Sequence, residues 1–257
     1  NKPIISLVQD TCVGSYLLTR YDNYLTKTQM RDILIDIDKF NGILPEPYIK
    51  AGTLDKDLPP SFPNHKYDTS NDLWSGRQLF ELVMPNINFQ KKNKSYSLND
   101  KDNRNIVKIE NGKIIDGIFD KNMIGEGEQG LIHIIHNDHG HVATQNFLDN
   151  MQNIVTNFIL INGFSVGIGD LIPDNTCKQD MKQIVSEKKE KVIELIEHTH
   201  QGVLERKGGK NISDEFESQI LGILNRVTNE TGELALKSLN NSNRMLNMIR
   251  SGSKGSD

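Results

Sequence analysis

The chain has 257 residues, of which 36% are hydrophobic and 25% are charged, and its formal net charge at pH 7 is -4. This composition is typical of a globular protein, and the charge argues against a general affinity for nucleic acid or acidic membranes. No apolar run approaches the ~20 residues of a membrane span, and no signal peptide is apparent. Cys12 and Cys177 show neither metal-type spacing nor a disulfide framework, which indicates a reducing, intracellular compartment.

The first third of the chain predicts short elements separated by a loop. Pro3–Leu18 mixes β-branched residues with a glycine and predicts a strand and a turn. Thr26–Phe40 has apolar residues at helical spacing and predicts a helix, with Thr28 as its N-cap. Thr53–Asp72 contains three prolines among polar residues and predicts a mobile surface insertion. A short helix is expected over Trp74–Leu82.

The middle of the chain changes from strand patterns to a helix pattern. Asn111-Gly112 lies between the apolar runs Ile106–Ile109 and Ile114–Phe119, which is a strong β-hairpin signal. Leu131–Ile135 predicts a further strand. In Ala143–Asn162 the apolar residues recur three or four positions apart, which predicts a buried helix that ends at the following glycine.

Two long amphipathic helices are predicted after Asp170. One apolar stripe runs from Met181 to Val203 and a second from Phe216 to Leu239, and KGGKN at Lys207–Asn211 separates them. This pattern predicts an antiparallel helical hairpin. The expected fold class is therefore α+β, with a mixed α/β domain over residues 1–170 and a helical domain over residues 171–257.

Four histidines, His133, His136, His139 and His141, crowd one segment and raise the possibility of a metal site. Strand alternation over Leu131–Ile135 would send the first two to opposite faces, and no cysteine joins them. A solvated turn is the favoured interpretation. Likewise, Lys91–Lys113 has seven basic residues against three acidic ones but a single aromatic, so a solvated hairpin is favoured over a nucleic-acid groove.

The run INGFSVGIGD at Ile161–Asp170 contains three glycines in eight residues. Gly167-Ile168-Gly169 begins a GxGxxG pattern, but Ile172 occupies the third glycine position and no P-loop lysine is present. A tight helix–loop–helix joint is therefore favoured over a phosphate cradle. In this interpretation Asp170 or Asp174 caps the next helix, and the glycines allow close backbone packing.

Lys254 lies in a GSKGS run, where its small neighbours leave it accessible to a phosphate group, although in isolation a flexible linker is the favoured interpretation. The sequence shows no nucleophile–base pair and no carboxylate cluster with metal spacing. It therefore predicts no catalytic residue, metal or cofactor within this chain. Because the sequence begins with Asn1 rather than Met, we expect a piece of a longer polypeptide.

Seven runs resemble the largest subunit of multisubunit DNA-directed RNA polymerases, especially the eukaryotic polymerase II type. They occur in the family's order and cover almost the whole chain. The runs are NKPIISLVQDT at Asn1–Thr11, NGILPEP at Asn41–Pro47, LWSGRQ at Leu73–Gln78, GLIHII at Gly130–Ile135, INGFSVGIGD at Ile161–Asp170, FESQILGILN at Phe216–Asn225 and SGSKGS at Ser251–Ser256.

The resemblance implies a pore domain over residues 1–170 and a funnel over residues 171–257. Together these would line the secondary channel for nucleotides, and the funnel would help to dock the transcript-cleavage factor. Lys254 matches a lysine that faces the path of the nucleotides. Asn225 matches a position on the wall that binds the inhibitor amatoxin, and Thr228 replaces a family arginine nearby, so poor amatoxin sensitivity is expected.

The resemblance also implies what lies outside this chain. In the family, an aspartate-rich loop that holds the catalytic Mg²⁺ precedes this region, and the bridge helix and trigger loop follow it. The chain alone is therefore expected to be inactive, whereas the intact enzyme is a nucleotidyltransferase. Its partners would be the other polymerase subunits, the DNA template, RNA and nucleoside triphosphates, with no membrane.

The insertion, the histidine-rich turn and the abundant asparagine depart from the family's usual pattern. They favour a divergent enzyme from an AT-rich genome, such as a large DNA virus, or otherwise an asparagine-rich protist. The expected compartment is the host cytoplasm or virion in the first case and the nucleus in the second. Two other functions fit the residues without the resemblance: an independent helical-hairpin interaction module without catalysis, and a stand-alone nucleotide-binding enzyme.

Overall fold

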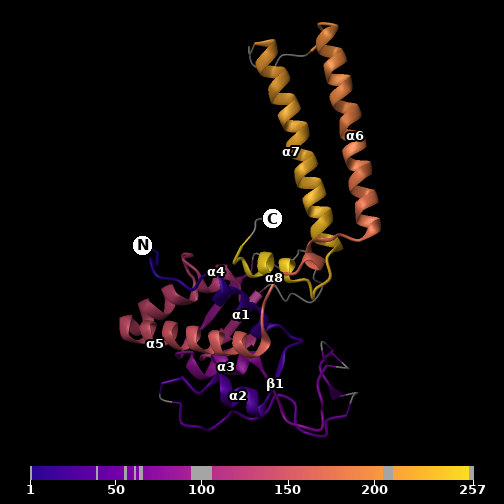
Figure 1. The fold of residues 1–257 in the computed structure, drawn as a ribbon. Coiled ribbons are helices and arrows are strands. Elements are labelled where there is room, and N and C mark those ends of the chain that lie inside the picture. The colour runs from indigo at the N-terminus through magenta and orange to yellow at the C-terminus, as the bar shows by residue number, and fades with distance from the viewer. Residues whose placement is uncertain are drawn as a thin grey trace. The chain divides into compact units, whose positions relative to one another are not determined.

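The computed structural model describes residues 2–38, 40–54, 57–60, 62–63, 66–93, 106–204 and 211–254. The chain divides into two compact units, with Asn1–Ser165 and Asn247–Ser256 in the first and Val166–Leu246 in the second. Helices and small antiparallel sheets make up the described part, so the fold class is α+β, as predicted (Figure 1). No helix among the described residues is both long and apolar enough to cross a membrane.

The first unit contains two small sheets and a set of packed helices. Its elements are α1 (Asp10–Thr19), β1 (Tyr24–Thr26), α2 (Lys27–Ile33), β2 (Leu73–Ser75), α3 (Gly76–Val83), β3 (Phe89–Lys92), β4 (Ile106–Glu110), β5 (Lys113–Asp116), α4 (Lys121–Ile124), α5 (Leu131–Asn162) and most of α8 (Arg244–Ser251). β1 pairs antiparallel with β2, and β3, β4 and β5 form a second antiparallel sheet in that order.

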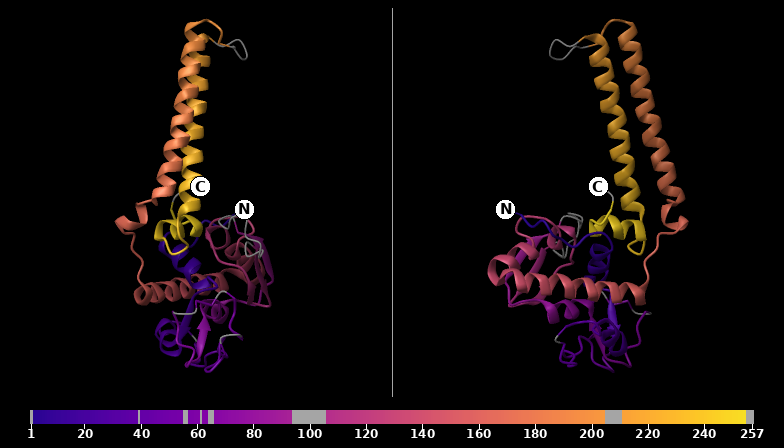
Figure 2. Two further views of the ribbon diagram at one scale, coloured as in Figure 1. Left: turned by 90° about the vertical axis from the view of Figure 1, so that its right-hand side faces the viewer. Right: turned by 60° about the vertical axis from the view of Figure 1, so that its left-hand side comes forward.

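The long helix α5 forms the centre of this unit, where it packs against α1, α2 and α3 (Figure 2). Its buried face includes Phe147, Met151 and Phe158, which lie four and seven residues apart in turn, as expected for one side of a helix. The contact with α1 is close at Gly14, where a Cβ atom would lie 2.3 Å from Cγ1 of Val155. The missing side chain therefore lets the two helices approach.

Helix α1 contradicts the prediction of a strand and turn over Pro3–Leu18. It begins at Asp10, directly after Gln9, whose φ of 50° is unusual for a residue other than glycine. Eight of its ten residues are buried, so its sequence carries no amphipathic period from which a helix could be recognised. Its β-branched residues were misread as a strand signal for the same reason.

The prediction of a strand over Leu131–Ile135 is also wrong, because these residues form the first turns of α5. A break at Gly140, with φ 79° and ψ -177°, divides α5 into two helical pieces. The first piece is short and apolar, and such a run cannot be assigned to a helix or a strand by periodicity alone. The predicted helix over Ala143–Asn162 and its end at Gly163, with φ 67°, are confirmed.

The residues that form the turn of the hairpin agree with the prediction, whereas the residue that begins α2 does not. The hairpin of β4 and β5 is confirmed, and both Asn111 and Gly112 have the positive φ that its turn requires. α2 is shorter than predicted, and its N-cap is Thr26 rather than Thr28. The hydroxyl of Thr26 accepts the backbone N–H of Gln29, whose side chain in turn accepts the N–H of Thr26.

Residues of the segment Thr53–Asp72, the predicted mobile insertion, contribute to a second, smaller core, and the mobility of the segment stays a prediction. Phe62 is buried with its ring 5.1 Å from that of Tyr24, and Tyr67 lies 5.5 Å from the same ring. The Tyr67 hydroxyl also accepts the backbone N–H of Tyr24 at 3.1 Å. Aromatic packing therefore anchors part of this segment, although residues 55, 56, 61, 64 and 65 lie outside the described ones.

The second unit consists of a 3₁₀ turn, η2 (Ile168–Leu171), and two long helices, α6 (Asn175–His200) and α7 (Ile212–Ser238). The two helices run side by side in opposite directions in Figure 1, and an ion pair of 2.6 Å joins Lys188 to Glu230 across them. Asp174 caps α6 by accepting the N–H of Cys177 at 2.7 Å, as predicted. The division into a pore domain and a funnel domain at Asp170 stays a prediction.

Candidate functional site

Lys254 is exposed and follows the turn that ends α8. Two backbone hydrogen bonds close this turn: Ser253 N–H donates to Met248 O at 3.2 Å, and Gly252 N–H donates to Ile249 O at 2.9 Å. This pair of bonds is the Schellman motif, which requires a left-handed residue after the helix. Gly252 supplies it with φ 72°. The segment before Lys254 therefore has a defined geometry, which differs from that of a flexible linker.

The Gly252 backbone lies against the start of α4. A Cβ atom on Gly252 would approach Cβ of Lys121 to 2.8 Å, which is closer than real Cβ contacts. Lys121 is itself held in place because the buried Asp120 caps α4 by accepting the N–H of Met123 at 3.2 Å. The contact brings the backbones that carry two exposed lysines, Lys121 and Lys254, close together.

The helix that precedes Lys254 is bound to α1 by polar side chains. Arg20 Nη1 donates to Oδ1 of the buried Asn247 at 3.2 Å, and Arg250 lies near enough to Tyr16 for its charge to act on the phenol. Burial raises the pKa of Tyr16, although the charges of Arg20 and Arg250 partly oppose this shift. The hydroxyl is therefore neutral at physiological pH.

Arg20 has a second anchor in Asp22. Its Nε donates to Asp22 Oδ1 at 2.8 Å, so one guanidinium group joins Asp22 to Asn247. Burial alone would raise the pKa of Asp22, but the hydrogen bonds and charge of Arg20 outweigh it, and the pKa is lowered. Asp22 is therefore ionised at neutral pH and keeps Arg20 oriented toward α8.

Asp170, the last residue of INGFSVGIGD, binds the start of α8 to the 3₁₀ turn η2. Its carboxylate accepts the backbone N–H of Gly167 at 2.9 Å and that of Arg244 at 3.2 Å, and its backbone carbonyl accepts Asn243 Nδ2 at 2.9 Å. The N–H donors of Gly167 and Arg244 lower the pKa of Asp170. The aspartate of the motif therefore has a structural role within the second unit.

The glycines of this motif do not act as predicted. A Cβ atom on Gly169 would meet nothing within 4 Å, and one on Gly167 would meet only Oδ2 of Asp170 at 3.8 Å. The prediction of close backbone packing at these two glycines is therefore wrong for the described residues. Gly163 is explained by its positive φ at the end of α5, whereas nothing in the structure explains why Gly167 and Gly169 lack side chains.

Asn225 and Thr228, the predicted positions on the inhibitor wall, lie on the exposed surface of α7. Thr228 Oγ1 donates to the backbone carbonyl of Leu224 at 3.2 Å, so its side chain folds back onto its own helix. Leu221 and Leu224 are each 50% exposed on the same stretch of α7. These residues belong to the second unit and Lys254 to the first. The roles of all three predicted site residues stay predictions.

The histidine-rich segment lies in α5, so the strand argument that placed His133 and His136 on opposite faces was wrong. His133 Nδ1 accepts the N–H of Gln129 at 3.2 Å, and His139 Nε2 lies 3.1 Å from the carbonyl oxygen of Asn86. Across the described parts of the chain, no group of three or more His, Cys, Asp or Glu side chains is arranged to hold a metal ion.

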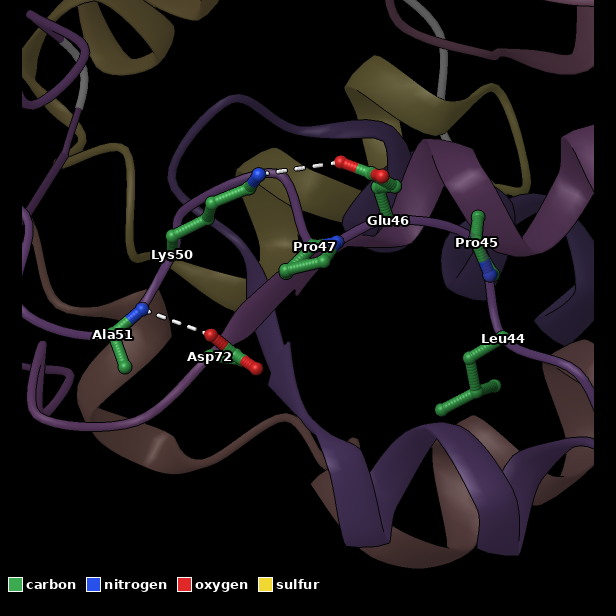
Figure 3. A pocket seen from close by; sticks show the side chains of 7 residues that line it. All are labelled: Leu44, Pro45, Glu46, Pro47, Lys50, Ala51 and Asp72. Atoms are coloured by element: carbon green, nitrogen blue, oxygen red, sulfur yellow. Dashed lines mark hydrogen bonds and ion pairs between the residues drawn. The ribbon is translucent and has the colours of Figure 1, made fainter.

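An open hollow of about 480 Å³ lies on the first unit near the NGILPEP run (Figure 3). Lys50 forms an ion pair of 3.3 Å with Glu46 at its edge, and Asp72 accepts the N–H of Ala51 at 2.9 Å. Each charged side chain of the lining therefore has a partner within the lining itself. Lys254 is not among the lining residues, which are Leu44, Pro45, Glu46, Pro47, Lys50, Ala51 and Asp72.

Comparison with known families agrees with the resemblance of the sequence runs. Residues 1–171 match the family described as RNA polymerase Rpb1, domain 3, and residues 195–257 match RNA polymerase Rpb1, domain 4. The chain belongs to the RNA polymerase Rpb1 family. It is therefore part of the largest subunit of a DNA-directed RNA polymerase, a nucleotidyltransferase of transcription that works with other polymerase subunits. The viral origin and the compartment stay predictions.

Sequence reasoning found Lys254 but missed the residues that hold it in place. Tyr16 and Arg20 lie near the start of the chain, whereas Asn247 and Arg250 lie near its end. No local pattern links these residues, because each pair meets only once α1 and α8 have packed. The Schellman turn was the one feature with a local signal, since a glycine directly after a helical segment commonly ends it.

Proposed function

We propose that the first unit lines the path by which nucleoside triphosphates reach the active site of the polymerase, and that Lys254 attracts their phosphates. The observation that carries this proposal is an exposed ammonium group on a turn of defined geometry, in a chain of this family. An exposed lysine attracts a triphosphate without binding it tightly, because water and salt screen the interaction. Weak attraction suits a site that a substrate must leave in order to react.

The test is a steady-state assay of nucleotide addition by the complete polymerase that carries this chain. We expect Lys254→Ala to raise the KM for nucleoside triphosphates about three- to fivefold with kcat unchanged, because it removes an attraction made before the chemical step. Lys254→Arg keeps the charge and should keep the KM close to that of the unchanged enzyme. An unchanged KM in Lys254→Ala at low salt would refute the proposal.

We further propose that α6 and α7 form the funnel that receives the transcript-cleavage factor. The support is the exposed pair Leu221 and Leu224, which lie three residues apart on a long helix whose other exposed residues, apart from Ile212 at its start, are polar or glycine. Exposed apolar side chains next to one another on a helix suit a protein contact. Leu221→Ser together with Leu224→Ser should weaken factor-stimulated transcript cleavage while leaving nucleotide addition intact. Equal stimulation of both enzymes would contradict this role.

We propose that the chain has no catalytic activity by itself and that Mg²⁺ binds elsewhere in the complete enzyme. The described residues supply no suitable set of carboxylates for this ion, which is bound through oxygen ligands. The isolated chain should therefore not extend an RNA primer on a DNA template in the presence of Mg²⁺. Extension that depends on the chain, and that persists after repurification, would contradict the proposal.

A further inference from the structure

The chain contains three Asn-Gly dipeptides, which begin at Asn41, Asn111 and Asn162. In such a dipeptide the backbone nitrogen of the glycine readily attacks the side-chain amide of the asparagine, because glycine has no Cβ atom to hinder the approach. Asn41 and Asn162 are both exposed, as are the glycines that follow them. Exposure therefore does not separate these two dipeptides, and the hydrogen bonds of the glycine nitrogens decide which asparagine reacts.

The backbone nitrogen of the glycine is engaged in two of the three dipeptides. Gly112 N–H donates to Ile87 O at 3.0 Å, and Gly163 N–H donates to Ile159 O at 2.8 Å. Gly112 is also buried. A nitrogen whose proton lies in a hydrogen bond reacts only after local opening of the backbone has broken that bond. The folded structure therefore protects the asparagines that precede these two glycines.

The dipeptide of Asn41 and Gly42 lacks this protection. Within the described part of the chain, the N–H of Gly42 has no hydrogen-bond partner, and an added Cβ atom would meet nothing within 4 Å. The side-chain Oδ1 of Asn41 accepts the backbone N–H of Ile43 at 3.0 Å. This bond folds the amide back over the Gly42 peptide, and it stabilises the negative charge that develops on Oδ1 during an attack on Cγ. The nucleophile is therefore free, while the group that it attacks is held and polarised.

We propose that Asn41 is a site of spontaneous deamidation in the folded chain. The Gly42 nitrogen gives its proton to solvent and bonds to Cγ of Asn41, the bond from Cγ to Nδ2 breaks, and ammonia leaves with a proton from water. Water then opens the resulting succinimide, which yields aspartate by attack at Cγ or isoaspartate by attack at the main-chain carbonyl carbon. Either product adds a negative charge at neutral pH, three residues before Leu44 in the lining of the hollow (Figure 3). This inference is independent of the role of Lys254.

The test is mass spectrometry of the full, unaltered chain after incubation at mildly alkaline pH. Each conversion adds about 1 Da to the peptide that carries the asparagine. In the folded chain, Asn41 should convert at least about fivefold faster than Asn111 and Asn162, and an equal or faster rate at either of these would overturn the proposal. In concentrated urea the three rates should converge to within about twofold, because the protecting bonds are lost. The same preference for Asn41 in urea would show that the fold does not select this site.

The products and one pair of variants test the route through the ring. Isoaspartate, detected by its enzymatic methylation, should form together with aspartate, whereas aspartate alone would indicate direct hydrolysis and contradict the proposal. Gly42→Ala should slow the conversion of Asn41 at least about fivefold, because the new methyl group hinders the attacking nitrogen. Gly163→Ala is the matched control, since Gly163 also has a positive φ and open surroundings, and the rate at Asn41 should not change. An unchanged rate in Gly42→Ala would overturn the proposal.

Discussion

The close crossing of α1 and α5 at Gly14 yields a quantitative prediction. Tyr16 lies in α1 and Arg20 directly follows this helix, and the place of α1 in the unit depends on packing against α5. In Gly14→Ala the new Cβ atom would lie 2.3 Å from Cγ1 of Val155 and 3.1 Å from Cδ1 of Ile159. Both distances are shorter than an ordinary contact of 3.4–4 Å, so α1 and α5 must separate or their side chains must leave their preferred rotamers.

Two opposing terms set the size of the effect. Alanine is a better helix former than glycine and would stabilise α1 by about 1 kcal/mol. Overpacking of a dense core costs roughly 1–3 kcal/mol, and a distance of only 2.3 Å to a buried valine puts this variant near the upper end. We therefore expect Gly14→Ala to lower the free energy of unfolding of the first unit by about 1–2 kcal/mol.

Urea unfolding followed by tryptophan fluorescence measures this change. The chain has one tryptophan, Trp74, which is buried in the first unit, so its signal reports on that unit. Val155→Ala removes the atom in closest conflict, and the double variant should be about 1–2 kcal/mol more stable than the sum of the two single effects predicts. An unchanged or raised stability of Gly14→Ala would show that α1 and α5 do not cross this closely.

Gly222→Ala in α7 is the matched control for the stabilisation that comes from the higher helix propensity of alanine. Gly222 lies within a helix, and an added Cβ atom would meet nothing within 4 Å. This variant should gain the propensity term alone, so the second unit should become more stable by at most about 1 kcal/mol. Far-ultraviolet circular dichroism follows the unfolding of that helical unit, and a loss of stability here would undermine the separation of the two terms.

Three further predictions concern single groups. Burial raises the pKa of Cys12 to about 11, so only about 0.1% of this thiol is ionised at pH 8. In a Cys177→Ser chain, Cys12 should therefore react with a disulfide reagent at least about 10-fold more slowly in the folded than in the unfolded state. Equal rates in the two states would contradict this prediction. The pKa of Asp170 is lowered from 3.8 in the folded chain, so its ionised carboxylate stabilises the fold above pH 3.8, and this stabilisation is lost as the pH falls through the lower folded pKa. Asp170→Ala should therefore lower the thermal midpoint more at pH 7 than near pH 2.5. Equal losses at the two pH values would refute this prediction. A complete polymerase with this chain should resist amatoxin. Thr228→Arg should increase the inhibition of that polymerase by amatoxin, because the arginine restores a bidentate donor. Inhibition of the unaltered enzyme at the concentrations that stop polymerase II would refute this expectation.

The parts of the fold that the sequence predicted are those whose signals are local. The hairpin at Asn111-Gly112 and the end of α5 at Gly163 depend on residues that favour positive φ at fixed places. The helix over Ala143–Asn162 has one apolar face because its other side meets solvent. In each case the residues that determine the conformation are next to one another in the chain.

The elements that were mispredicted are those whose environment is set by distant residues. α1 is buried on nearly all sides by packing partners from elsewhere in the chain, so its sequence lacks the contrast between a wet and a dry face. Phe62 and Tyr67 lie in a proline-rich stretch with no period, and their rings pack against that of Tyr24, which is far away in the sequence. Neither partner could be identified from the local pattern.

The difference between local sequence signals and distant packing partners also applies to Lys254 and bears on its proposed function. Lys254 was found through a resemblance of short runs, which identifies a residue type at a position but not the geometry that presents it. That geometry depends on the backbone of Gly252, where both the left-handed φ and the 2.8 Å approach to Lys121 exclude a side chain. A lysine on a free linker would lose rotational freedom each time it met a phosphate, whereas the Schellman turn removes part of that freedom during folding. Gly252 therefore matters to the lysine through entropy, even though it would not touch the nucleotide.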